Sequence, residues 1–153
     1  MTKRWLSACV SALVLAVAFA SGGSAQDGLA TVKVTIAGFK GKEGVALIAL
    51  YDSEQTWRTI PKAVQVLRMK ITGANMTVEF KGVKPGSYAV AVVHDENKNN
   101  ELDMRWLPYP KPKEGSAASN DPEAKSGPPK WDGAKFAVTE AGTTIKATMK
   151  YFD

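Results

Sequence analysis

The amino-acid sequence predicts an all-β fold, a seven-stranded antiparallel Greek-key β-sandwich with one long Pro-rich loop. Three observations predict it. Short segments alternate apolar and polar side chains with a period of two, as half-buried strands do. Clusters of Gly, Pro, Asn and Asp separate these segments, and no apolar pattern supports an amphipathic helix longer than two turns. Short strands at this spacing in one domain are typical of a β-sandwich.

Seven segments carry the strand pattern. They are residues 30–36, 45–51, 64–71, 76–80, 86–93, 135–139 and 143–151. In the first, Val32, Val34 and Ile36 alternate with Thr and Lys, which indicates one buried face. Residues 45–51 are apolar throughout, as expected for a central strand buried on both faces. Residues 64–71 alternate less regularly, so the pattern defines the buried face of that strand less sharply.

Turn-forming residues connect these strands. Residues 38–44 contain three glycines and are typical of a turn. Pro85 and Gly86 occupy the two central positions of a type II turn. Residues 140–142 join the last two strands as a hairpin, and residues 52–57 are expected to form a single helical turn capped by Asp or Ser.

The N-terminal segment is predicted to be a targeting signal. Two basic residues within the first four positions precede an apolar run over residues 6–20, and small residues follow at 23–25. This order is typical of a secretory signal peptide, whereas a membrane anchor would need about 20 apolar residues. We therefore expect a signal peptide over residues 1–25 and one domain over residues 26–153, exported to the periplasm or the extracellular space of a Gram-negative bacterium.

Composition argues against two kinds of function. The net charge of the full chain is +5, and removal of Lys3 and Arg4 leaves 18 basic against 15 acidic residues, or +3. This excess is too small, and the lysines too dispersed, to indicate nucleic-acid binding. The single cysteine, Cys9, lies in the predicted signal peptide. The exported domain is therefore expected to contain no disulfide and no thiol chemistry, and the sequence predicts no transmembrane segment in it.

Oxygen-bearing side chains recur at alternate positions directly after the fifth predicted strand. They belong to Asp95, Asn97, Asn99, Glu101 and Asp103. Hard cations such as calcium take about 6–8 oxygen ligands, so these five side chains form a predicted calcium site. The match to a helix–loop–helix calcium loop is partial, because Asn100 replaces its glycine and its closing Glu is missing. The alternative is an Asx-rich turn that caps the strand by bonding to its own backbone.

A proline-rich segment follows over residues 104–133. It holds six of the eight prolines, and segments this long are usually functional or disordered. Trp106, Tyr109 and Trp131 are large rings that a disordered linker would not normally carry. We expect them to pin an ordered loop over one end of the sheet, the alternative being a mobile flap. Together with His94 they are candidate residues for binding a small molecule or a glycan.

Two stretches in the middle of the chain resemble known families. Residues 83–90 look like the signature hairpin of transthyretin-like and carboxypeptidase-regulatory-like sandwiches. Residues 94–103 resemble the HDxNxNGxLD motif of the DUF2141 family, with Asn100 where that motif has Gly.

Later residues extend this second resemblance. Glu114-Gly115, Ser119-Asn120 and residues 127–136 look like the EG…SN…GPPxFxxAxF pattern of the same family. The resemblance then covers nearly all of residues 30–151. It implies an immunoglobulin/transthyretin-like sandwich in an exported bacterial protein of uncharacterised function.

The residues favour a binding module over an enzyme. Binding groups tend to lie on loops that a rigid scaffold holds in place. We therefore expect an exported binding or envelope accessory module with a calcium-stabilised loop. One alternative is a protein–protein interaction module that docks an envelope partner through residues 104–133. The other is a hydrolase that uses His94, the only histidine, although no Ser lies in a nucleophile elbow.

Overall fold

The computed structural model describes residues 28–123 and 127–152, so the predicted signal peptide lies outside the described residues. This part of the chain is mostly β-structure. Its ten strands are β1 (Ala30–Ala37), β2 (Val45–Tyr51), β3 (Gln65–Met69), β4 (Asn75–Val83), β5 (Gly86–Asp95), β6 (Met104–Arg105), β7 (Lys111–Pro112), β8 (Ser116–Ala118), β9 (Phe136–Val138) and β10 (Thr143–Thr148). Its helical elements are one 3-10 turn, η1 (Ile60–Lys62), and the short helix α1 (Trp131–Ala134). No helix among these residues is long and apolar enough to cross a membrane.

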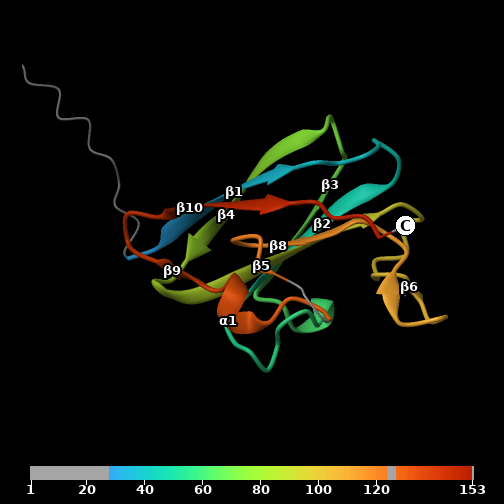
Figure 1. The fold of residues 1–153 in the computed structure, drawn as a ribbon. Helices are drawn as coiled ribbons and strands as arrows, with labels where there is room; N and C mark the ends of the chain where they lie inside the picture. The colour runs from blue at the N-terminus through green and yellow to red at the C-terminus, as the bar shows by residue number, and fades with distance from the viewer. Residues whose placement is uncertain (1–27, 124–126, 153) are drawn as a thin grey trace, which may run out of the picture.

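The strands form three open sheets (Figure 1). A three-stranded sheet has the order β10-β1-β4. A five-stranded sheet has the order β3-β2-β5-β8, and β9 also pairs with β5. The strands β6 and β7 pair only with each other among the described residues and form a small hairpin at one end of the molecule (Figure 1).

One strand pair corrects the expectation of a purely antiparallel fold. β1 and β10 run parallel, with Val34 opposite Ile145 in the register. A parallel pair needs a long crossover connection between its strands. Here all the strands from β2 to β9 lie between β1 and β10 in sequence. No local sequence pattern can determine the relative direction of two strands this far apart in the chain.

The seven predicted strands are present as β1 to β5, β9 and β10, and their limits differ from the predicted ones by a few residues. The description of residues 104–133 as one loop was wrong, because β6, β7, β8 and the start of α1 lie inside it. These three strands are only two or three residues long. They are too short to show a period, and β8 is a strand only because it pairs with the middle of β5.

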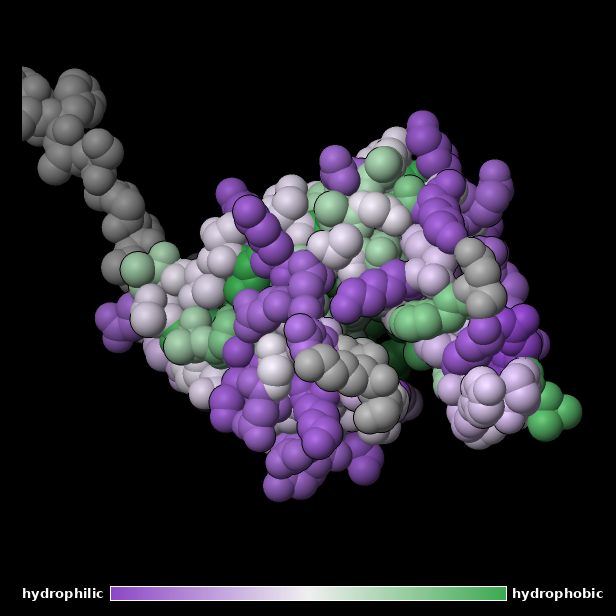
Figure 2. Space-filling view, in the orientation of Figure 1, coloured by the Kyte–Doolittle hydropathy of each residue, from purple (hydrophilic) through white to green (hydrophobic). Residues whose placement is uncertain are grey.

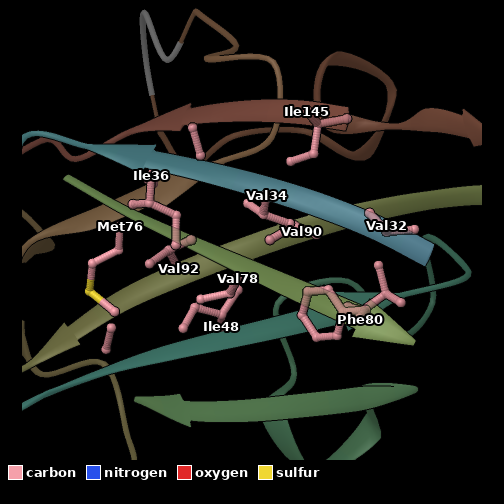
Figure 3. Close-up of a cluster of buried hydrophobic side chains, with 14 of the residues drawn as sticks. Val32, Val34, Ile36, Ile48, Met76, Val78, Phe80, Val90, Val92 and Ile145 are labelled. Carbon is pink, nitrogen blue, oxygen red and sulfur yellow. The ribbon is translucent and has the colours of Figure 1, made fainter. Parts of the chain in front are cut away.

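Side chains from the three-stranded and five-stranded sheets meet in one hydrophobic core (Figure 3). On β1, Val32, Val34 and Ile36 are fully buried, which confirms the predicted inner face of that strand. Ile48 of β2 and Val92 of β5 approach them from the other sheet.

A second apolar cluster covers the other face of the five-stranded sheet. Ala49 and Tyr51 of β2 belong to this second cluster, whereas Ile48 and Leu50 belong to the main core. Trp131 of α1 completes the cover, and α1 lies on the side of β5 away from the three-stranded sheet (Figure 1). Burial on both faces is the physical reason why β2 is apolar at every position.

Candidate functional site

The acidic residue at the end of β5 caps the loop that follows. The Asp95 side chain is fully buried. Its Oδ1 accepts a hydrogen bond from the backbone N–H of Asn99 at 3.0 Å, and its Oδ2 accepts one from the N–H of Asn100 at 2.9 Å. Asn100 has a φ of 65°, in the left-handed region that Asn tolerates better than most residues. Asp95 therefore closes the loop by accepting hydrogen bonds from backbone N–H groups four and five residues further along the chain.

The side chains of Asn97 and Asn99 converge on the carboxylate of Asp103. Their Nδ2 atoms donate to Oδ2 and Oδ1 of Asp103 over 2.7 and 3.0 Å. Their side-chain oxygens accept the backbone N–H groups of Asn99 and Glu101. The amide nitrogens, rather than the oxygens, therefore face Asp103. A cation bound to Asp103 would have to displace both of these donors.

A buried carboxylate outside the predicted set completes this loop. Glu114 is 5% exposed, and its two oxygens accept the backbone N–H groups of Glu96 at 3.0 Å and Asp103 at 3.2 Å. In the sequence, the only sign of this role was its place in the Glu114-Gly115 part of the family resemblance. Glu101, by contrast, is exposed and contributes its backbone N–H to the loop.

The carboxylates of this region do not gather around one point. In residues 28–123 and 127–152, no three His, Cys, Asp or Glu side chains lie where they could share a metal ion. A cation in the loop would therefore depend on Asn and backbone oxygens in addition to carboxylates. Such oxygens are ordinary calcium ligands.

The imidazole of His94 is buried and bonded at both nitrogens. Nε2 lies 2.9 Å from the backbone oxygen of Glu43, which can only accept, so Nε2 carries a proton. In the neutral ring, Nδ1 then accepts the hydroxyl proton of Tyr151 over 2.8 Å. The Tyr151 oxygen in turn accepts the backbone N–H of Lys40. This chain of hydrogen bonds leaves neither imidazole nitrogen for a nucleophile or a substrate.

A polar hollow of about 350 Å³ lies over this chain of hydrogen bonds. Its lining includes Lys40, Glu43, Glu96, Lys113 and Tyr151. Burial raises the pKa of Tyr151, the charge of Glu96 raises it further, and the hydrogen bond from Lys40 opposes both effects. Two lysines and two glutamates give the hollow no net preference for an anion or a cation. No local pattern could place Tyr151 here, because it lies 57 residues from His94 in the chain.

The three rings expected to pin the proline-rich segment are not brought together. Trp131 is buried, and its ring lies edge-on to that of Trp57 at 5.9 Å. Trp57 also donates from Nε1 to the backbone oxygen of Pro129, so Trp57 and Trp131 together fix this end of the segment. Trp106 and Tyr109 follow β6, which lies away from α1 in Figure 1, and both side chains are exposed, so they do not anchor the segment. The expectation that these two rings anchor the segment was wrong.

The hairpin of β6 and β7 instead carries an exposed apolar tip, which we define as Trp106, Leu107 and Tyr109. These side chains are 69%, 81% and 71% exposed. Figure 2 shows hydrophobic (green) atoms at the outer end of the part of the molecule where Figure 1 places β6. Leu107 was missing from the predicted set, although the sequence signal was present: three large apolar residues lie within four positions.

The buried polar groups coincide with the stretches that carry the family resemblance. Among the described residues, the buried polar or charged side chains are His94, Asp95, Glu114 and Ser119. Ser119 donates to the backbone oxygen of Ala134 at 2.6 Å and accepts the N–H of Val90. His94, Glu114 and Ser119 join β5 or its following loop to distant segments, and Asp95 closes that loop, so the resemblance rests on residues that hold the fold.

Comparisons with known proteins agree with that resemblance. The family model described as "Uncharacterized protein conserved in bacteria (DUF2141)" matches residues 34–146. No curated protein and no solved structure matches the chain.

Proposed function

We propose that this chain, which belongs to the DUF2141 family, is a binding module that docks an envelope partner through the tip of its β6–β7 hairpin. A single observation carries the proposal: Trp106, Leu107 and Tyr109 are each more than two-thirds exposed. Residues of this kind are rarely left in water without a function, and Trp and Tyr are enriched at the centres of binding interfaces.

The hydrogen bonds at the base of the hairpin support this role. The backbone oxygen of Asp103 accepts the N–H of Lys113 at 2.9 Å, so the chain enters and leaves the hairpin at a fixed point. Glu114 holds the N–H of Asp103 at the same place. A tip mounted on a fixed base loses less conformational entropy on binding than a flexible one.

We infer that the two larger sheets form a Greek-key sandwich of the immunoglobulin/transthyretin-like class. The inference is supported by the single core to which both sheets contribute and by the edge positions of β3, β4 and β10. In this class, loops cluster at the ends of the sandwich, where ligands are bound. The loop over residues 95–103 and the β6–β7 hairpin would form one such end.

We also propose export by a cleaved signal peptide over residues 1–25, to the periplasm or the extracellular space of a Gram-negative bacterium. The order of basic, apolar and small residues supports it. Expression of the full chain in such a host, with N-terminal sequencing of the product outside the cytoplasm, tests it. A product that starts near Gln26 is expected, and an uncleaved cytoplasmic product would refute it.

A second proposal is a weak calcium site formed by Asp95, Asn97, Asn99, Glu101 and Asp103. The observation that favours it is the convergence of both asparagine amides on Asp103. Rotation of the two amides would direct oxygens to the place where the nitrogens now lie. Their bonds with backbone N–H groups would be lost, so the site would be weak.

The docking proposal is tested with residues 26–153, which contain every described strand. Wild-type protein, a tip variant with Ala at 106, 107 and 109, and a control variant are mixed with a washed envelope fraction, and the retained protein is measured. The control replaces three exposed apolar residues at edge strand β3, namely Val64 just before the strand and Val66 and Met69 within it. We expect only the tip variant to lose retention.

Equal retention of all three proteins would reject the docking proposal. Retention that a soluble glycan or a small molecule from the envelope abolishes by competition would instead identify the tip as a small-ligand site. A hydrolytic activity lost in His94→Ala, with the fold intact, would favour the enzyme alternative.

A further inference from the structure

We propose that the partner of the exposed tip is the surface of an anionic lipid bilayer, into which Trp106, Leu107 and Tyr109 insert. This inference rests on the proposed docking function and names the partner of the same site. It is carried by the order of residue types along the hairpin, by the charge of the hairpin and by the position of the nearest carboxylates.

The first observation is the order of side chains along the hairpin. Residues 105–110 are all exposed, and the apolar side chains lie in the connection between β6 and β7. Arg105 precedes this apolar connection, and Lys111 and Lys113 follow it. A bilayer presents the same order of layers, with hydrocarbon inside, Trp and Tyr favoured at the boundary and anionic headgroups outside. The hairpin matches that order when its tip points into the membrane.

The second observation is the charge of the hairpin. Residues 104–113 carry Arg105, Lys111 and Lys113 and contain no Asp or Glu. The net charge of this ten-residue segment, +3, therefore equals that of the whole predicted exported domain. Basic residues beside an apolar wedge are attracted to anionic headgroups, and this attraction adds to the burial of apolar surface.

The third observation is that the two carboxylates that flank the hairpin in sequence already accept hydrogen bonds from the preceding loop. Asp103 accepts hydrogen bonds from two asparagine amides, and Glu114 is buried on two backbone N–H groups. Glu101 is exposed in the preceding loop, where Lys98 is exposed as well. Arg105 beside the tip and Lys113 at the base of the hairpin are both exposed, so they add positive charge to the side of the molecule that carries the tip.

The shape of the site favours a membrane over a protein partner. The tip projects from one end of the molecule (Figure 2), and no described residue buries its three side chains. A protein partner would need a pocket matched to these three side chains, whereas a fluid bilayer adapts to a projecting wedge. The rings can keep their polar groups at the headgroup level while Leu107 enters the hydrocarbon.

Vesicle co-sedimentation tests the proposal with residues 26–153, because the apolar run over residues 6–20 would bind vesicles by itself. One set of vesicles contains phosphatidylcholine alone, and the other contains phosphatidylcholine and phosphatidylglycerol in equal amounts. We expect binding to the anionic vesicles. In the tip variant it should fall by about tenfold or more, since burial of even one Leu-sized side chain is worth roughly that factor.

A charge variant provides the second arm. Arg105→Gln with Lys113→Gln should lower binding by about fivefold for each cation removed. Its matched control, Lys81→Gln with Lys84→Gln, removes the same charge from two exposed positions near the end of β4 and in the turn after it, and it should bind like the wild type. Lipids brominated on their acyl chains should quench the fluorescence of Trp106, and Trp106→Phe should abolish that quenching while binding persists.

The outcomes separate this inference from the docking proposal. Tip-dependent retention by the envelope fraction without binding to anionic vesicles would overturn the membrane inference and leave a protein or glycan partner. Vesicle binding that is equal in the wild-type and tip variants would overturn it as well. If the wild-type protein is neither retained by the envelope fraction nor bound by anionic vesicles, both proposals are overturned.

Discussion

The backbone N–H of Asp103 donates a 3.2 Å hydrogen bond to Oε2 of Glu114, so the residues that precede and follow the β6–β7 hairpin meet at its base. The other oxygen of the same carboxylate accepts the N–H of Glu96 at 3.0 Å. One buried side chain therefore ties both ends of the loop after β5 to the segment that follows the hairpin. Loop and hairpin form one unit, so a change in the loop is expected to reach the exposed tip.

Replacement of this carboxylate should destabilise the unit. In Glu114→Gln, one of the two accepting oxygens becomes an NH₂ group. That group and the backbone N–H of Glu96 or Asp103 are then both donors, so the hydrogen bond between them is lost. We expect a loss of about 1–3 kcal/mol in the free energy of unfolding, the usual cost of a buried unsatisfied donor. Urea unfolding measures it, and limited proteolysis should show faster cleavage within the hairpin.

Glu101→Gln is the matched control, because Glu101 is exposed in the same loop. Its free energy of unfolding should stay within about 0.5 kcal/mol of the wild type. Equal effects of the two substitutions would show that Glu114 has no special part in holding the loop.

Gly115→Ala should disrupt the contact between this segment and the C-terminal end of the chain. A Cβ at Gly115 would lie on the ring of Tyr151, so that ring must move away from His94. Forced repacking of this kind typically costs about 1–3 kcal/mol. Chemical denaturation measures the loss, and Gly41→Ala, where a Cβ would make only an ordinary 4.0 Å contact with the backbone nitrogen of Glu43, is the control.

The double variant Gly115→Ala with Tyr151→Ala separates this clash from a backbone effect. If the ring is the obstacle, the two substitutions are strongly non-additive, since Tyr151→Ala removes the obstacle. Additive losses in free energy would assign the effect to the backbone of Gly115 instead.

Tyr51→Phe should leave stability unchanged or raise it. The hydroxyl of Tyr51 is buried and has no hydrogen-bond partner among the described residues. Removal of an unpaired buried polar group relieves its desolvation penalty. The melting temperature measures the effect. A clear drop would show that the hydroxyl bonds to a buried water or to another group.

The same residue predicts how stability depends on alkaline pH. Burial raises the pKa of Tyr51 from 10.0 to about 12, although the charge of Arg58 acts in the opposite direction. Between these values the unfolded chain binds fewer protons than the folded one, so the free energy of unfolding falls as pH rises. The slope from this group is at most about 1.4 kcal/mol per pH unit. Urea titrations across this range should show a smaller slope for Tyr51→Phe, and an identical slope would refute the assignment.

Calcium should raise the melting temperature of residues 26–153 if the loop binds it, and EDTA should reverse the rise. A ligand bound only by the folded state adds about 2.7 kcal/mol at a hundred times its Kd. Asp103→Ala should abolish the shift, and Asp132→Asn, at an exposed Asp elsewhere, should keep it. No shift at about 10 mM calcium, above the range of weak extracellular sites, would reduce the loop to an Asx-rich turn.

Several features of the candidate site could be predicted from the sequence because they are local. The alternation of Asp95, Asn97 and Asn99 indicated a loop that its own side chains could hold, and the hydrogen bonds that Asn97 and Asn99 accept two residues on agree with the Asx-turn alternative. Glu114 and Tyr151 could not be found in this way, since they reach the loop and His94 from distant parts of the chain. The exposure of Trp106 could not be found either, because an aromatic ring in a loop has the same sequence signature whether it is buried or projects.

Seven of the ten strands could be read from the sequence, because side-chain periodicity and turn residues act over a few neighbouring positions, and the motifs also pointed to the DUF2141 family. The parallel direction of β1 and β10 and the pairing of β8 with β5 came from the folded chain alone. The folded chain also decided that Trp131 packs inside while Trp106 and Tyr109 lie outside. These outcomes depend on contacts between residues far apart in the chain, whose energies no local pattern records.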